Sequence, residues 1–150
     1  MYHSVVRRIV RRTFDHLNHA DYALVVAMYD PQIVHSFPGD HALSGVRHSV
    51  PAVLQWYDRL FRIFGKIQFG VQQVIVQGLP WNTSVAVKVN IGATLKDGRP
   101  YTNVLAMFVE LKWGRITSIS MHEDTQKLAH ALNDLAIQGI VEASAAPITG

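Results

Sequence analysis

The residues best suited to proton transfer are His122 and Asp124, which stand two positions apart near the end of a predicted strand. A carboxylate can accept a proton and an imidazole can hold or pass one, so this pair indicates general acid–base chemistry. Alternate residues of a strand share a face, and here one face carries Ser118, Ser120, His122 and Asp124, while the other carries Thr117, Ile119, Met121 and Glu123. We expect the polar face to form one wall of a cavity, with Asp124 as catalytic acid or base and His122 assisting it.

Both members of this pair also have a purely structural interpretation. Asp124 directly precedes a predicted helix that starts at Thr125, and aspartate is a preferred helix N-cap worth about 1 kcal/mol. Backbone N–H groups bonded to the carboxylate would weaken it as a base. A hydrogen-bonded structural histidine would equally account for His122. The sequence leaves both alternatives open at both positions.

A second polar pair, Lys88 and Asn90, lies on one face of a strand predicted from 84 to 95. We expect both side chains to point into the cavity, because a cation, an amide, an imidazole and a carboxylate would then converge on a substrate. Exposure of Lys88 at a sheet edge is the alternative, since an unpaired lysine is costly to bury. The apolar residues of the other face would then cover the outside of the sheet: Val85, Val87, Val89 and Ile91. Two chains pairing through that outer face would shield it from water, so a homodimer is predicted.

Further candidates would bind substrate without a catalytic role. His35 lies on a short predicted strand, 33–37, near the expected mouth of the cavity. Tyr101 follows the hairpin signal Asp97-Gly98, and it either contacts the substrate or stabilises the turn. The apolar faces of two predicted helices supply aromatic residues that are expected to line the pocket or the core: Phe14, Trp56 and Tyr57.

The periodicity of apolar residues places these candidates on helices followed by strands. Helices are predicted at 4–19, 22–29 and 46–64, strands at 67–76, 84–95, 101–111 and 116–122, and a last helix from 125 to 139. The apolar phase changes at Gln72-Gln73, which is typical of a β-bulge that bends a sheet. We therefore expect an α+β fold in which a curved antiparallel sheet wraps around helices as a cone. A single domain is predicted over 1–139, with a loosely ordered tail over 140–150.

Composition narrows the classes of partner and cofactor. The chain has 49% hydrophobic and 17% charged residues, which is typical of a globular domain, and no cysteine for disulfide or thiolate chemistry. It has neither an apolar run of about 18 residues nor a signal-peptide pattern, so a cytoplasmic protein without membrane contact is expected. The net charge of +3 is not accompanied by a nucleic-acid-binding motif. His16 with His19, and His41 with His48, lack a third ligand, so no metal or other cofactor is expected.

Over nearly its whole length the chain resembles the NTF2-like superfamily, and within it the SnoaL-like proteins. The resemblance is carried by FDHLNHAD (14–21), VHSFPGDHALSGVR (34–47), WYDRLFRIF (56–64), GLPWNTSVAVKV (78–89), DGRPYTN (97–103) and WGRITSISMHEDTQKLAHAL (113–132). It implies the cone fold and a cavity that serves isomerases, dehydratases, cyclases, epoxide hydrolases or pure binding domains. At the positions that match the base and the two oxyanion donors of ketosteroid isomerases, this chain has Ser36, Phe14 and Ala106, which disfavours that reaction.

Two other relatives imply different outcomes for the polar candidates. The catalytic relay of limonene-epoxide hydrolases matches Lys88, Asn90 and Asp124, and Asn90 cannot accept a proton as the relay requires. SnoaL-type polyketide cyclases rely chiefly on one aspartate, at the position of Asp124. The favoured function is therefore a SnoaL-like enzyme that applies acid–base chemistry, without a cofactor, to a compact apolar molecule bearing a carbonyl or epoxide group. The alternative is a non-catalytic module that binds a small ligand or dimerises.

Overall fold

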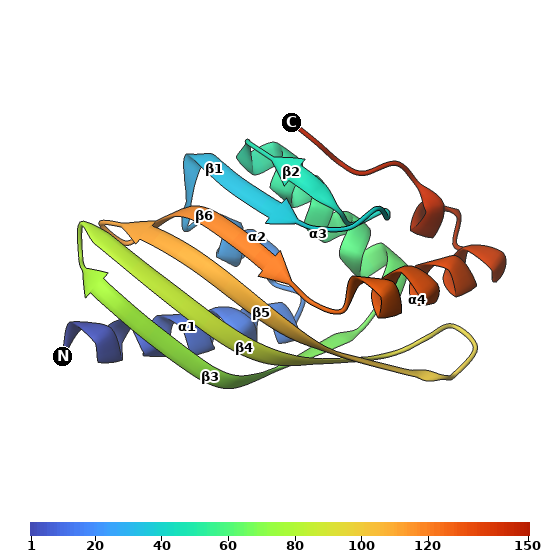
Figure 1. The fold of residues 1–150 in the computed structure, drawn as a ribbon, viewed down its shortest axis with the longest axis horizontal. Coiled ribbons are helices and arrows are strands. Elements are labelled where there is room, and N and C mark those ends of the chain that lie inside the picture. The colour runs from blue at the N-terminus through green and yellow to red at the C-terminus, as the bar shows by residue number, and fades with distance from the viewer.

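A curved six-stranded sheet in the order β2-β1-β6-β5-β4-β3 forms the centre of the computed structural model, which describes residues 1–150. The helices are α1 (Tyr2–Asn18), α2 (Tyr22–Val26), α3 (Val50–Phe64), α4 (Thr125–Ile137) and the short 3-10 helix η1 (Val141–Ser144). The strands are β1 (Tyr29–Phe37), β2 (Gly45–Arg47), β3 (Ile67–Leu79), β4 (Asn82–Thr94), β5 (Pro100–Lys112) and β6 (Arg115–His122). In Figure 1, α1, α2 and α3 lie behind the sheet, and α4 continues from the end of β6. The expected α+β cone is confirmed.

Helix α3 begins later than the sequence predicts. The helical spacing starts at 46, but Gly45–Arg47 pair with β1 as the short strand β2, and the helix itself begins at Val50. The Ser49 side chain caps it by accepting a hydrogen bond from the Ala52 N–H at 3.3 Å. Pro51 lies in the first turn, where its missing N–H has no consequence. None of the helices is both long and apolar enough to cross a membrane.

The bend of β3 results from the predicted β-bulge, which is confirmed. Val71 pairs with Val89 and Gln73 with Lys88, so Gln72 is the extra residue with no partner on β4. The extra residue shifts the alternation of side chains along the strand by one position. Apolar side chains before and after the bulge therefore both face the helices. The curvature of β3 is visible in Figure 1.

The predicted orientation of β4 is wrong. Val85, Val87 and Val89 are buried beneath the helices, whereas Lys88 and Asn90 are exposed on the outer face of the sheet. Alternation along a strand defines two faces but not which of them lies inside. The side chains that face α1 must be apolar, since an unpaired lysine there would lose its hydration without compensation.

This orientation changes the basis of the predicted homodimer. The apolar side of β4 is already covered by the protein's own helices, so it cannot be the surface that a second chain covers. The outer face carries three hydrophobic side chains that are about half exposed, Ile75, Val104 and Phe108, among smaller and polar neighbours. Dimerisation through the outer face stays a prediction, and it would now depend on these three residues.

One pair of strands departs from the antiparallel arrangement. Strand β1 lies parallel to β6, with His35 opposite Ile119, and it begins at Tyr29, four residues before the predicted start. The remaining neighbours in the sheet are antiparallel. Because β1 and β6 run in the same direction, both end beside the segment that leads into α4.

The C-terminal segment 140–150, for which a loosely ordered tail is predicted, lies against α3 and β2. Arg62 Nη2 contacts Glu142 at 2.6 Å, and Arg59 Nη1 donates to the Ala146 carbonyl at 2.7 Å. The buried Arg47 donates from Nη1 to the carbonyl of Ile148 at 2.9 Å. Three arginines therefore hold the segment at three points along its length.

The side chain of Asn18 attaches the C-terminal end of α1 to the bent edge strand β3. Asn18 Oδ1 accepts from the Phe69 N–H at 2.6 Å, and Asn18 Nδ2 donates to the Phe69 carbonyl at 3.0 Å. On an edge strand these backbone groups have no ladder partner on the open side. The asparagine thus satisfies both groups at once and fixes the distance between α1 and the sheet.

Replacing Asn18 with alanine should lower the free energy of unfolding by about 1 to 3 kcal/mol, because two hydrogen bonds are lost from a half-buried position. Urea denaturation measures the change, and faster hydrogen exchange at the Phe69 amide would localise it. Arg12→Ala, on the exposed face of the same helix, serves as the control and should change little. Equal stabilities for the two variants would contradict the anchoring role.

Candidate functional site

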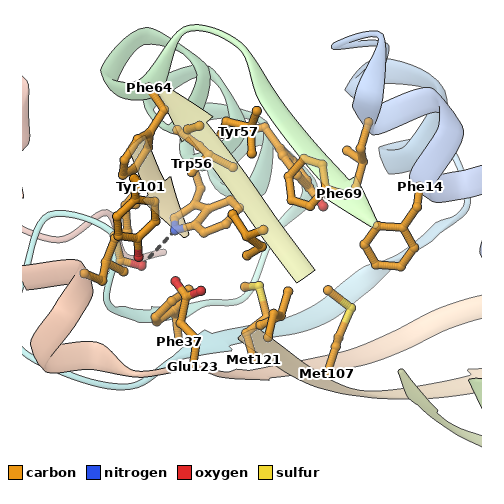
Figure 2. A pocket seen from close by; sticks show the side chains of 18 residues that line it. Phe14, Phe37, Trp56, Tyr57, Phe64, Phe69, Tyr101, Met107, Met121 and Glu123 are labelled. Carbon is orange, nitrogen blue, oxygen red and sulfur yellow. Dashed lines mark hydrogen bonds between the residues drawn. The ribbon is translucent and has the colours of Figure 1, made fainter. Parts of the chain in front are cut away.

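A cavity of about 50 Å³ lies between the inner face of the sheet and helices α1 and α3. Of its 18 lining residues, 17 are hydrophobic, and Glu123 is the one acidic or basic side chain among them. Figure 2 shows the wall of aromatic rings and two methionines, with the Glu123 carboxyl group directed into the space between them. The polar chemistry of this cavity therefore depends on one carboxyl group.

The position of Glu123 follows from the phase of β6. Ile119 and Met121 are buried on the inner face, and Glu123 is the next residue of the same phase, just beyond the end of the strand. Its Oε2 atom is buried and has no hydrogen-bond partner in the protein. Burial, together with the neighbouring charge of Asp124, raises the pKa of Glu123 to about 7. Near neutral pH the group is therefore present in both its protonated and its ionised form.

Tyr101 supplies a hydroxyl group at the same end of the cavity. Asn103 Nδ2 donates to the Tyr101 hydroxyl oxygen at 2.8 Å and to the Asp124 carbonyl at 3.1 Å. Burial raises the pKa of Tyr101, and the nearby charges of Glu123 and Asp124 raise it further, so the phenol keeps its proton. Since its oxygen already accepts from Asn103, the Tyr101 O–H is left free to donate toward a ligand.

The predicted catalytic pair does not reach this cavity. Asp124 is exposed and caps α4, with Oδ1 accepting from the Lys127 N–H at 3.1 Å. It borders a shallow hollow on the outside of the molecule that also includes Asn90. His122 is exposed on the outer face, 2.8 Å from Ser120 Oγ and edge-on to the Phe108 ring. The structural interpretation of Asp124 as a helix cap is therefore the one that its geometry supports.

The four predicted polar residues consequently do not converge. Lys88, Asn90 and His122 lie on the outer face and Asp124 lies at the rim, because β4 and β6 both have the opposite phase to the one predicted. The sequence contained the signal for Glu123. Ile119 and Met121 are more apolar than the serines that alternate with them, which places their shared face, and Glu123 with it, on the inside.

The aromatic candidates lie where they are predicted. Phe14, Trp56, Tyr57 and Tyr101 all line the cavity. Trp56 Nε1 donates to the Leu43 carbonyl at 2.8 Å, and the hydroxyl groups of Tyr57 and Tyr29 are 3.0 Å apart. With these polar atoms paired within the protein, Trp56 and Tyr57 act as apolar walls. Their binding of a substrate stays a prediction.

His35 is fully buried but does not line the cavity. Its Nδ1 accepts a hydrogen bond from Arg47 Nε at 2.9 Å, and its ring lies edge-on to Trp56 with centroids 4.8 Å apart. Burial, together with the positive charge of Arg47, lowers the pKa of His35 to about 3. The neutral imidazole thus holds the buried arginine behind the aromatic wall, at a distance from the carboxyl group of the site.

No three His, Asp or Glu side chains are grouped so that they could hold a metal ion. The eight histidines of the chain are dispersed over its helices, strands and turns. The site therefore rests on the Glu123 carboxyl, the Tyr101 hydroxyl and the apolar walls.

The curved sheet that encloses this cavity belongs to the NTF2-like fold. An NTF2-like protein of unknown function from Burkholderia pseudomallei superposes with a TM-score of 0.72 at 18% identity, covering 83% of this chain and 95% of that chain. PrhC from Penicillium brasilianum gives a TM-score of 0.73 at 12% identity and covers 87% of each chain. TerC, co-crystallised with polyporic acid, gives 0.71 at 15% identity, covering 81% of this chain and 93% of that chain. At these identities the similarity establishes the fold alone.

The SnoaL-like domain family matches residues 10–119, and the chain belongs to this family. No curated protein matches the sequence. The matched range includes the second half of α1, all of α3 and Tyr101, and it ends four residues before Glu123, so the family match alone does not identify the carboxyl group.

Replacing His35 with leucine should destabilise the protein by about 1 to 3 kcal/mol or more, because Arg47 Nε would then be buried without an acceptor. His35→Asn keeps an acceptor near the position of Nδ1 and should cost less. The folded pKa of His35 is depressed, so its stabilisation is present above the usual pKa of 6.5 and is lost as pH falls toward 3. Thermal unfolding of the wild type and the two variants across this range measures both effects, and an equal loss in the two variants would contradict the proposed pairing.

Glu123 should make the protein less stable as the pH rises. Its folded pKa of about 7 exceeds the ordinary value of 4.5, so stability is greatest below 4.5 and falls until the pH passes 7. Glu123→Gln removes this dependence, and its stability relative to wild type should increase by about 3 kcal/mol between about pH 4 and about pH 8. Urea denaturation at the two pH values measures the difference. A difference that does not change with pH would show that the carboxyl is ordinarily hydrated.

Proposed function

We propose that this SnoaL-like protein is an enzyme in which Glu123 performs acid–base chemistry on a small, largely apolar substrate that bears a carbonyl group. The observation that carries the proposal is the position of Glu123, the one acidic or basic group of an apolar cavity, with Oε2 buried and unpaired. Such a group at the end of a concave apolar site is a usual arrangement for catalysis.

The chemistry that suits these residues is proton transfer beside a carbonyl. The ionised Glu123 removes a proton from the carbon next to the carbonyl, and the electron pair of the broken C–H bond moves onto the carbonyl oxygen as an enolate. The Tyr101 O–H donates to that oxygen, where the negative charge develops. The protonated Glu123 then returns the proton to the same or another carbon, so no cofactor is required.

The acidity of Glu123 fits this role. A general base is most effective when its pKa lies close to the working pH, since enough of it is ionised and it still binds the proton firmly. With a pKa of about 7, Glu123 meets this condition at neutral pH. A carbonyl substrate is favoured over an epoxide, because the cavity offers no second carboxyl group that could activate water.

The alternative function is the binding of a small ligand without turnover. It is favoured by the scarcity of polar groups in the cavity, where most of the wall offers apolar contact alone. In that case the protonated Glu123 and Tyr101 would both act as hydrogen-bond donors to a carbonyl oxygen.

Exchange of hydrogen for deuterium at the carbon beside the carbonyl of 2-butanone, followed by NMR in heavy water, tests the proposal. Wild-type protein should accelerate the exchange, with a rate that rises through about pH 7 as Glu123 ionises. Glu123→Gln should lower the rate by roughly 100-fold or more, the usual contribution of a general base.

Asp124→Asn is the matched control for that experiment. Asparagine is as effective a helix cap as aspartate, so this variant should keep both the stability and the exchange activity of the wild type. Removing the Asp124 charge should also move the pH midpoint of the rate to a lower value, since that charge raises the pKa of Glu123. Equal rates for wild type and Glu123→Gln would refute the proposal, and ketone binding without exchange would favour the ligand-binding alternative.

A further inference from the structure

A second apolar cavity, of about 240 Å³, lies between α1, α2 and the sheet. It has 21 lining residues, of which 18 are hydrophobic, and none of them is acidic or basic. Representative members come from α1, from the segment around α2 and from the inner faces of β5 and β6: Val6, Val10, Val25, Met28, Val109 and Ile116. This volume exceeds that of the cavity around Glu123, and the acid–base chemistry above makes no use of it.

The two cavities are separated by one layer of side chains. Phe14, Leu17, Tyr57 and Met107 line both of them. In Figure 2, Phe14 and Met107 lie at the end of the first cavity that is remote from Tyr101. Methionine has an unbranched side chain with three rotatable bonds, and Met107 is only partly buried. A rotation of Met107 or Phe14 would therefore connect the two volumes.

The second cavity offers a ligand few hydrogen bonds. Its hydroxyl groups are already paired within the protein: Tyr2 with Thr83, Tyr29 with Tyr57, and Thr13 with the Ile9 carbonyl. An apolar ligand group is therefore favoured in this space, since a polar group would lose most of its hydration with little compensation. An alkyl chain meets this requirement.

Size supports the same conclusion. Sites for drug-sized ligands usually begin at roughly 300 Å³, and neither cavity alone reaches this volume, whereas the two joined approach it. On the side away from Glu123, the second cavity is bordered by Val5 and Ile9 of α1, which are 43% and 41% exposed, and by Trp113, which is 72% exposed. A chain could pass between the helix and the β5–β6 turn at this border.

We propose that the two cavities form a single elongated site for a linear amphiphile, with its carbonyl head at Glu123 and Tyr101 and its alkyl tail extending past Phe14 and Met107 into the α1 cavity. The position of the head rests on the proposed function, whereas the tail depends only on the second cavity. The substrate class is therefore a medium-chain ketone or a related acyl compound, rather than a compact molecule.

A homologous series of ketones tests this inference: 2-butanone, 2-hexanone, 2-octanone and 2-decanone, with binding measured by ligand-observed NMR. Affinity should increase by about fourfold for each added methylene group until the second cavity is full. Val10→Trp places an indole in the second cavity alone. It should abolish the gain for 2-octanone and 2-decanone while leaving the binding and exchange of 2-butanone unchanged.

Arg11→Trp is the matched control, because it adds the same side chain to the exposed face of the same helix. It should retain the full dependence on chain length. Met107→Ala removes part of the side-chain layer between the two cavities and should accelerate the association of 2-decanone. This variant tests the elongated site if Val10→Trp fails to fold. An unchanged chain-length profile in Val10→Trp, or no acceleration in Met107→Ala, would overturn the inference.

The failure of this inference is distinguishable from failure of the proposed function. Glu123-dependent exchange of 2-butanone without any gain for longer chains would refute the elongated site alone. A full chain-length gain in a protein whose exchange activity does not require Glu123 would refute the proposed chemistry and retain the elongated site.

Discussion

The interior of the cone is almost entirely apolar, and this constraint determines which polar groups can lie there. The inner faces of the long strands pack against α1 and α3, with residues such as Val87 and Val89 nearly inaccessible to water. An unpaired charge in such surroundings costs several kcal/mol, so an acidic side chain must either leave or take up a proton. Lys88 and Asp124 lie outside, whereas Glu123 stays inside with its pKa raised to about 7. Because the apolar surroundings disfavour the charged form and raise the pKa, this carboxyl group can exchange a proton near neutral pH.

The space around Glu123 is maintained by polar contacts that lie at the edges of the apolar interior. Gln72 bends β3 as an extra residue, and Asn18 holds the end of α1 to the strand beside that bend. On the other side, Arg47 lies 5.5 Å from the Trp56 ring and donates to His35, so the aromatic wall is supported from behind by a buried cation. These contacts leave the cavity wall itself free of side chains that would compete with a ligand for the carboxyl group.

The sequence predicts the order of the elements, the bulge and the aromatic lining, but not the side of the sheet that faces inward. Helical and strand periods are local properties, and the apolar phase change at Gln72-Gln73 is visible in a short stretch. The inward face depends on which side the helices cover, which is a tertiary property. The polar face ending in His122 and Asp124 suggested a catalytic wall, although a polar face is equally typical of the outside of a sheet. Comparing the apolar alternatives, Ile119 and Met121, would have favoured Glu123 from the sequence alone.

Glu123 and Asp124 are adjacent acidic residues that differ in their contribution to the stability of the fold. Asp124 caps α4 through the Lys127 N–H, and this contact is a sufficient structural reason for its presence. Glu123 makes no comparable contact through Oε2, and its burial lowers stability at every pH above its ordinary pKa. A methionine or leucine at this position would complete the apolar wall and remove that penalty. A residue that lowers stability, in a cavity that the rest of the chain encloses, supports the proposal that Glu123 acts on a bound molecule.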